Sequence, residues 1–214
     1  MTEGIKAIIF DMDGTLTDSL GIWTEADATF LERLGYDYDP SVSEAMKTLH
    51  YASACEYLKE RFSLSMTVEE IAESIIEIVH EKYVNEVPLK DGVAEFMKSC
   101  SDKGIKMCVA TSNDRSVACD ALKSLGIYDM LEFVITSDEV GCGKESPVIF
   151  EKCAERMGVS RSETAVFEDS VHAARSAYGA GFYTVGVYEK GYAEDFERIA
   201  EFAHKRIKSF REVI

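Results

Sequence analysis

Two carboxylates that stand two residues apart follow a short apolar run near the N-terminus. The run IKAIIF covers residues 5–10, and Asp11, Met12, Asp13 and Gly14 come directly after it. Such a run is typical of a strand buried on both faces, and carboxylates at its end can serve as nucleophile, metal ligand or proton donor. Gly14 permits a sharp turn, although a plain Asp-Gly turn without chemistry is the alternative. An EF-hand loop has its glycine elsewhere, so calcium is not expected.

Hydroxyl groups and a lysine stand near the ends of later segments. Thr111, Ser112 and Asn113 lie at the end of the run KMCVAT and just beyond it, where hydroxyls and backbone N–H groups suit a phosphate oxygen. The alternative is that these residues only cap a helix. Lys144, which follows Gly143, offers a cation for the same anion, with a solvated loop lysine as the alternative.

Two adjacent acids, Glu168 and Asp169, follow the apolar run TAVF at residues 164–167. Neighbouring carboxylates at the edge of a sheet suit a hard cation with oxygen ligands. Capping of a helix by Asp169 or Ser170 is the alternative. Because ligands of open α/β sheets bind at the carboxyl ends of the strands, we expect these clusters to meet in space.

The four clusters, read in order, are DMDGT, VATSN, GK and VFEDS. With them the sequence resembles the haloacid dehalogenase superfamily of phosphotransferases over essentially the whole chain. The resemblance implies that Asp11 is the nucleophile, that Asp13 is the general acid and base, and that Thr111 and Lys144 hold the phosphate. From the same turns we also expect contacts with phosphate or substrate by Gly14, Ser112 and Asn113.

The resemblance also implies a bound Mg²⁺. Its ligands would be the Asp11 carboxylate, the backbone carbonyl of Asp13 and Asp169, with Glu168 close by or ligating through water. A phosphate monoester repels a carboxylate nucleophile, and a divalent cation between them cancels that repulsion. A zinc site is a less favoured alternative, because the six cysteines include no CxxC pair.

The expected reaction proceeds through an aspartyl phosphate on Asp11, which splits one difficult displacement into two easier ones. Asp13 would protonate the leaving oxygen and then take a proton from water. A true dehalogenase is not expected, since halide leaves without a proton. His172 and Ala173 stand where the family often has Asn and Gly, so we expect an altered helix start and an intact metal site.

Alternating strand and helix patterns predict the scaffold that must position these residues. Apolar runs that predict strands stand at 5–10, 106–111, 133–136, 164–167 and 183–187. Helical patterns lie between the later runs, and such alternation predicts a doubly wound parallel α/β sheet with a Rossmann-like core. After residue 192 we expect a helix and then a short edge strand within KRIKSF, residues 205–210.

The alternation is interrupted from about residue 20 to residue 88. This interval has helical patterns without a convincing buried strand, and Thr67 and Glu70 have the spacing of a capping box. We therefore predict a helical cap domain over 20–88, inserted into a discontinuous core of 1–19 and 89–214. An insert at this place resembles the subgroup that contains phosphoglycolate phosphatase and β-phosphoglucomutase.

The cap would exclude water and select the substrate. The candidate contacts are Thr17, Ser19, Trp23, Lys47, His50 and Tyr51. Trp23 and Lys47 are the two that we expect to bind substrate, with packing and solvent exposure as their respective alternatives. The mutase branch of the family commonly has a histidine near position 23, so Trp23 favours a phosphatase.

The composition limits the partners. With 39 acidic and 23 basic residues, the formal net charge of −16 disfavours nucleic acid and anionic membranes. No segment has the roughly twenty apolar residues of a membrane span, and the N-terminus lacks the apolar stretch of a signal peptide. Scattered cysteines fit a reducing compartment, so we expect a cytoplasmic protein that is a monomer or weak dimer.

The sequence thus predicts a Mg²⁺-dependent phosphatase that acts on a small phosphorylated metabolite. A sugar phosphomutase of the β-phosphoglucomutase type is the first alternative. A phospholigand-binding protein without activity is the second, and it is disfavoured because all four motifs are intact.

Overall fold

The computed structural model describes residues 4–46, 49 and 51–214 of the chain. The contacts divide the chain into two compact units. The first, called the core unit here, comprises Met1–Leu20 and Val87–Ile214, and the second, the helical unit, comprises Gly21–Glu86. Each unit has its own packed interior, so each is described by itself.

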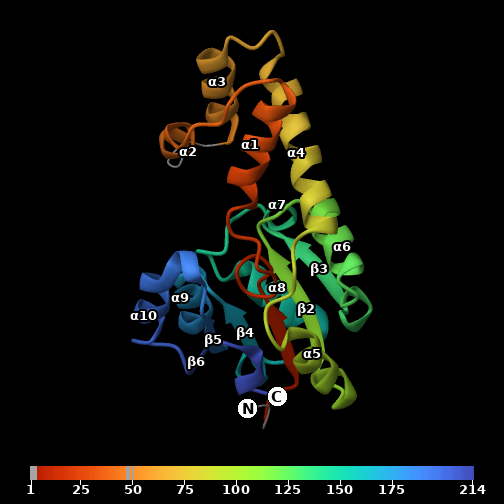
Figure 1. Cartoon of the computed structure of the whole chain (residues 1–214). Coiled ribbons are helices and arrows are strands. Elements are labelled where there is room, and N and C mark those ends of the chain that lie inside the picture. The colour runs from red at the N-terminus through yellow and green to blue at the C-terminus, as the bar shows by residue number, and fades with distance from the viewer. Residues whose placement is uncertain (1–3, 47–48, 50) are drawn as a thin grey trace. The chain divides into compact units, whose positions relative to one another are not determined.

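The core unit is built on one six-stranded sheet in which all neighbouring strands run parallel (Figure 1). The strand order is β3-β2-β1-β4-β5-β6. The strands are β1 Ala7–Phe10, β2 Lys106–Thr111, β3 Phe133–Thr136, β4 Thr164–Glu168, β5 Tyr183–Val187 and β6 Lys205–Ile207. The predicted doubly wound α/β fold is confirmed, and the predicted edge strand is β6.

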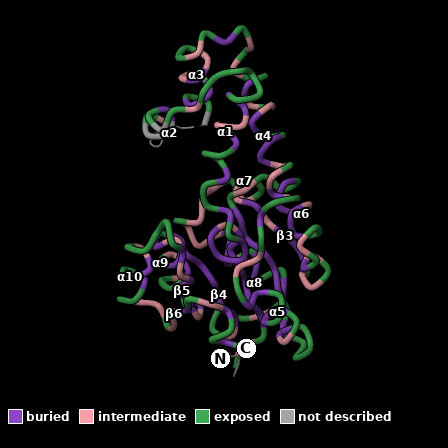
Figure 2. The backbone as a smooth tube through the Cα atoms, viewed as in Figure 1, coloured by how far each residue is buried: buried purple, intermediate pink, exposed green. Residues whose placement is uncertain are grey.

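Burial of the central strands explains their unbroken apolar runs. Every residue of β1 and β4 is buried, as Figure 2 shows for the middle of the sheet. A strand with helices on both faces has no solvent side, so it does not alternate between apolar and polar residues. These two adjacent strands therefore form the most enclosed part of the core unit.

Helices follow the strands. They are α5 Val93–Asp102, α6 Arg115–Ser124, α7 Ser137–Val140, α8 Val148–Met157, α9 Val171–Gly179 and α10 Ala193–Ile199. Short 3₁₀ turns lie at Tyr128–Met130, Arg161–Glu163, Lys190–Tyr192 and Phe210–Glu212. At the start of helix α8, Pro147 occupies the N-cap position and Val148 is the first helical residue.

Two apolar clusters fix the helices to the sheet. One includes Ile9 of β1, Phe150 of α8 and Ala177 of α9. The other is aromatic: Phe10, Phe96 and Phe210 have ring centroids 5.5–6.3 Å apart. Successive side chains of a strand point to opposite faces, so Ile9 and Phe10 place these clusters on opposite faces of the sheet.

The helical unit consists of α1 Ile22–Arg33, α2 Pro40–Met46, α3 Tyr51–Phe62 and α4 Val68–Asn85. The predicted capping box is present, since Glu70 N donates to Thr67 Oγ1 (3.1 Å) and Thr67 N donates to Glu70 Oε2 (2.8 Å). Residues of α4 at helical spacing are buried, including Ile71, Ile75 and Val79. The assignment of this unit as a cap stays a prediction.

The two segments that connect the core unit to the helical unit pair with each other. Thr17 and Leu89 form an isolated antiparallel bridge. Asp18 N donates to Pro88 O at 3.1 Å. These contacts hold the outgoing and returning segments side by side.

In the described part of the chain, no helix combines the length and the apolar character that a membrane span needs.

Candidate active site

The chemistry-bearing residues meet at the carboxyl ends of β1, β2 and β4. The chain passes from β1 to β2 and β3 on one side of the sheet, and β4 lies on the other side of β1. Strand order therefore reverses at β1, and the crevice at such a point is where α/β proteins bind ligands. Asp11 stands directly after β1, and Glu168 is the last residue of β4.

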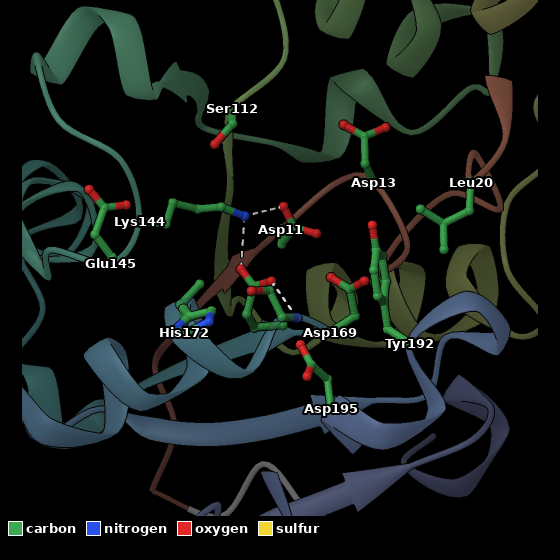
Figure 3. A pocket seen from close by; sticks show the side chains of 13 residues that line it. Asp11, Asp13, Leu20, Ser112, Lys144, Glu145, Asp169, His172, Tyr192 and Asp195 are labelled. Carbon is green, nitrogen blue, oxygen red and sulfur yellow. Dashed lines mark hydrogen bonds and ion pairs between the residues drawn. The ribbon is translucent and has the colours of Figure 1, made fainter. Parts of the chain in front are cut away.

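Lys144 lies between two of the carboxylates. Its ammonium group donates to Asp11 Oδ1 and, at 2.8 Å, to Glu168 Oε2. All three side chains are largely buried, with 11% of the Lys144 side chain exposed. Figure 3 shows Lys144 pointing to Asp11 from the opposite side of the cavity. Glu168 Oε1 accepts a further hydrogen bond from Ser170 N at 3.0 Å, so this carboxylate is held on both oxygens.

Asp169 packs against the turn that carries the first motif. Its Oδ1 accepts a hydrogen bond from Thr15 Oγ1 at 3.4 Å. Gly14 has φ +82°, and a Cβ at that position would overlap the Asp169 carboxylate. Glycine is required at this place for two reasons: the backbone is left-handed, and the Asp169 carboxylate lies too close for a Cβ. Thr15 stands inside the first motif, but its residue type and spacing did not predict this contact.

The carboxylates of Asp11, Glu168 and Asp169 are able to hold a cation. Each offers one oxygen, and these oxygens lie within 4.8 Å of one another. Asp11 Oδ2 is buried and has no hydrogen-bond partner among the residues that the structure describes. A buried carboxylate oxygen without a partner is costly unless a ligand satisfies it. Oxygen donors of this kind suit a hard divalent cation rather than zinc.

The charge balance of this cluster is uneven. Burial raises the pKa of Asp169 to about 9, and repulsion from Asp11 and Glu168 adds to the shift. Burial, together with repulsion from Asp11, also raises the pKa of Glu168, although Lys144 opposes the shift. Burial disfavours the charge of Lys144, but attraction to Asp11 and Glu168 outweighs it and raises the lysine pKa. Three carboxylates share one ammonium group, so a cation would relieve the excess negative charge.

Asp13 is held by two side chains. Ser19 Oγ donates to Asp13 Oδ1 at 2.7 Å, and Asn113 Nδ2 donates to Asp13 Oδ2 at 3.3 Å. Ser19 was predicted to contact substrate. Its hydroxyl orients Asp13 here, and the contact with substrate stays a prediction. Thr17 is buried and donates to the carbonyl of Met12 at 3.0 Å, so this hydroxyl supports the turn.

The polar turn after β2 presents one of its hydroxyls to the cavity. Ser112 lines the cavity, whereas Thr111 is fully buried and accepts a hydrogen bond from Asn113 N at 3.0 Å. The cap of α6 is Asp114, which accepts from Ser116 N and Val117 N. Helix capping therefore does not account for Thr111, Ser112 or Asn113, and their contact with phosphate stays a prediction.

The cavity has a volume of about 490 Å³. Apart from residues already named, its lining includes Leu20, Glu145, His172, Tyr192 and Asp195. Figure 3 shows Tyr192 and Asp195, from the segment after β5, pointing into it. Neither residue was among the predicted site residues. Their position after the carboxyl end of a predicted strand was the available signal.

The predicted substrate contacts of the helical unit remain predictions. Lys47 and His50 lie outside the described residues. Trp23 is the second residue of α1 and is 43% exposed.

Three known proteins are similar in sequence along most of the chain. The YhcW protein of Bacillus subtilis is 30% identical over 87% of this chain and 84% of its own length. Validoxylamine A 7'-phosphate phosphatase of Streptomyces hygroscopicus subsp. limoneus is 29% identical over 97% of this chain and 95% of its own length. Phosphorylated carbohydrates phosphatase of Thermotoga maritima is 27% identical over 83% of this chain and 82% of its own length.

Solved structures share the fold. A protein of Thermotoga maritima superposes with a TM-score of 0.86 at 24% identity and covers 98% of this chain and 100% of its own. β-Phosphoglucomutase of Clostridium difficile superposes with a TM-score of 0.68 at 20% identity and covers 98% of this chain and 93% of its own. A sequence model of the haloacid dehalogenase-like hydrolases matches residues 5–181. With its motifs, its sheet and its relatives in agreement, the chain belongs to the haloacid dehalogenase-like hydrolases.

Proposed function

We propose that this protein hydrolyses the phosphate monoester of a small metabolite through an aspartyl phosphate on Asp11. The observation that carries the proposal is the buried group of Asp11, Glu168, Asp169 and Lys144 at the point where strand order reverses. Strongly perturbed pKa values cluster at functional sites, so buried carboxylates with raised pKa values in a cavity are candidates for catalysis. The named phosphatases among the sequence relatives support the same activity.

Asp11 is the proposed nucleophile. One of its oxygens is held by Lys144, and the other is buried without a hydrogen-bond partner in the described part of the chain. A carboxylate fixed on one side keeps its orientation while the second oxygen stays available. Bond formation between an Asp11 oxygen and phosphorus would expel the alcohol and leave a phosphoryl group on the carboxylate.

Asp13 is the proposed general acid and base. Ser19 and Asn113 each donate a hydrogen bond to one of its oxygens, which holds the carboxyl group beside the cavity that it lines. Protonated Asp13 would deliver its proton to the leaving alcohol oxygen. The resulting carboxylate would then accept a proton from the water that attacks the aspartyl phosphate.

Mg²⁺ is the proposed cofactor, held by Asp11, the Asp13 backbone carbonyl and Asp169, with Glu168 near by. When bound, it would supply positive charge between the nucleophile and the phosphate. Lys144, Thr111 and the turn after β2 are proposed to hold the phosphate oxygens. Among Thr111, Ser112 and Asn113, Ser112 is the residue that lines the cavity. Its hydroxyl is therefore the best placed of that turn to contact a phosphate oxygen.

The substrate is proposed to be a small phosphorylated metabolite. The similar proteins act, by name, on validoxylamine A 7'-phosphate and phosphorylated carbohydrates. The helical unit is proposed to act as the cap, with Trp23 and Lys47 as candidate substrate contacts. The phosphomutase alternative is less well supported, since the likeness to β-phosphoglucomutase is at 20% identity and concerns the fold.

A panel of phosphorylated metabolites, with p-nitrophenyl phosphate as a simple monoester, tests this function. Free phosphate and isomerised sugar are both measured, with Mg²⁺ and with excess chelator. We expect phosphate release that chelation abolishes and Mg²⁺ restores. Full activity in chelator, or recovery with zinc alone, would reject the metal assignment. Glucose 6-phosphate formed from β-glucose 1-phosphate much faster than free phosphate would replace the phosphatase by a mutase.

A further inference from the structure

A second buried ion pair lies beside the site and outside all four motifs. The ammonium group of Lys90 donates to Gly14 O, Tyr188 O and Glu189 Oε2, each at 2.6 Å. An ammonium group has three N–H donors, so every one of them is used. The Lys90 side chain is 15% exposed and that of Glu189 only 4%. Such a pair is costly to bury and gives little stability by itself, which raises the question of what it holds.

Lys90 joins three segments that are distant in the sequence. It belongs to the segment that returns from the helical unit, where its own N–H donates to Leu16 O at 2.9 Å. Its side chain reaches Gly14 in the turn after Asp11, and Tyr188 and Glu189 in the segment after β5. The turn is therefore held by both the backbone and the side chain of one residue.

The position of Gly14 matters for the residues of the site. Gly14 follows Asp13 directly, and its Cα packs so closely on Asp169 that a Cβ would overlap the carboxylate. The turn closes on itself, since Gly14 N donates to Thr17 O at 3.0 Å. A shift of the Gly14 peptide would therefore displace Asp13 and change the contact with Asp169.

We propose that Lys90, held by Glu189, is a positioning residue that sets the Gly14 carbonyl and thereby the turn carrying Asp11 and Asp13. The inference rests on the proposed roles of those two aspartates. Lys90 acts through the Gly14 carbonyl and does not line the cavity. Displacement of a reacting group by about 1 Å can lower turnover on the order of 10²-fold, so the contact is large enough to matter.

The test separates positioning from stability with a single and a double variant. Lys90→Met leaves Glu189 buried without a cation, so we expect both thermal stability and kcat to fall. Lys90→Met combined with Glu189→Gln removes both charges, so thermal stability should return toward wild type. In the double variant the Gly14 carbonyl is still unheld. We expect kcat for p-nitrophenyl phosphate to stay about 10–100-fold low, with KM within about threefold of wild type. A kcat that recovers together with stability would overturn the proposal.

Two further variants complete the comparison. Lys106→Met removes a similar contact, since Lys106 Nζ donates to Met157 O at 2.6 Å near the opposite end of the sheet. It should leave kcat unchanged, and a loss equal to that of the double variant would overturn the positioning role. Glu189→Gln keeps an oxygen acceptor for Lys90 and should retain most of kcat.

Amide hydrogen exchange tests the positioning role of Lys90 without a measurement of turnover. In the double variant the N–H groups of Gly14 and Thr17 should exchange faster than in wild type, because the turn is no longer anchored. Unchanged exchange at both residues would contradict the proposal even if no substrate were found. A wild-type enzyme inactive on every ester with Mg²⁺ would instead refute the proposed function.

Discussion

The buried ion pairs of the candidate site in the core unit contrast with an exposed ion pair of the helical unit. In the core unit, Asp11, Glu168 and Lys144 are largely buried and pair over sequence separations of 24 and 133 residues. In the helical unit the ion pair of Arg33 and Glu81 is more than half exposed on both sides. Buried charges must be paired and hydrogen-bonded at considerable cost, whereas exposed pairs contribute little.

This difference shows that the costly burial of charged side chains is found at the candidate site. Glu168 and Asp169 have raised pKa values because burial and neighbouring carboxylates disfavour their charged forms. Local rules of stability are broken most often where a function requires it. The helical unit follows these rules more closely, with a capped α4 and an apolar face, and Asp27, whose pKa burial raises, is an exception.

The largest effect is expected for Asp11→Asn. An amide is a poor nucleophile, so turnover should fall at least ~10³-fold. The variant should nevertheless stay folded, because the change removes one of three crowded carboxylates. Steady-state hydrolysis and circular dichroism measure the two properties. An Asn variant with a tenth of wild-type activity would contradict the assignment of the nucleophile.

Asp13→Asn should lower turnover on the order of 10²–10⁴-fold, because the leaving alcohol then departs without a proton. The loss should be larger for an alkyl phosphate than for p-nitrophenyl phosphate, whose leaving group needs less help. The ratio of kcat/KM values for the two esters is the measurement, because kcat/KM reports the phosphorylation step and not hydrolysis of the common intermediate. Equal losses for both, or unchanged turnover, would remove Asp13 from the acid role.

A matched pair of variants compares the two units directly. Lys144→Met leaves Asp11 and Glu168 buried without their cation, so the free energy of unfolding should fall by about 3–5 kcal/mol in chelator. Arg33→Met removes an exposed pair and should cost at most about 0.5 kcal/mol. Urea unfolding at pH 8 gives both values.

Added Mg²⁺ should recover part of the loss in the Lys144 variant. In the Arg33 variant, whose site is intact, Mg²⁺ should stabilise as it does in wild type and leave the difference from wild type unchanged. Similar losses for the two variants would mean that the contrast between the units is wrong.

The smallest effect concerns Asp27 on α1. Burial raises its pKa from 3.8 to about 7. Between these values the folded state keeps a proton that the unfolded state releases, so stability falls as pH rises from about 4 to about 7. Asp27→Asn has no such proton to lose. It should be more stable than wild type above pH 7 by on the order of 1 kcal/mol, and about equal near pH 4.

Unfolding is followed by the fluorescence of Trp23, the single tryptophan of the chain, which lies in the same unit. Glu32→Gln, at an exposed position of the same helix, is the control and should leave the pH profile unchanged. A wild-type profile that does not fall over this range would show that Asp27 is ionised in the fold.

Much of the fold was predictable because its signals are local. Unbroken apolar runs identified the strands, and Thr67 with Glu70 identified the start of α4. Helix α7 was missed because its four residues are too few to show a helical period. The α/β prediction then brought the carboxyl ends of the strands together, which placed Asp11 near Glu168.

The contacts within the site were harder to predict, since they join residues that share no pattern. Lys90 and Glu189 are 99 residues apart, and neither stands in a motif or a periodic segment. Lys144 was expected to bind phosphate, but its pairing with Asp11 and Glu168 depends on how the loop before α8 folds back. Only tertiary structure determines such pairs.

The most direct test of the central claim is to trap a phosphoryl group on Asp11. In Asp13→Asn, p-nitrophenyl phosphate should still phosphorylate the enzyme, because its leaving group needs little acid help, while hydrolysis of the intermediate lacks its base. Rapid acid quench and mass spectrometry of the peptide fragments should then find the phosphoryl group on Asp11, together with a burst of p-nitrophenol close to one per enzyme. A phosphoryl group on another residue, or no burst and no labelled peptide while phosphate is released, would contradict the claim.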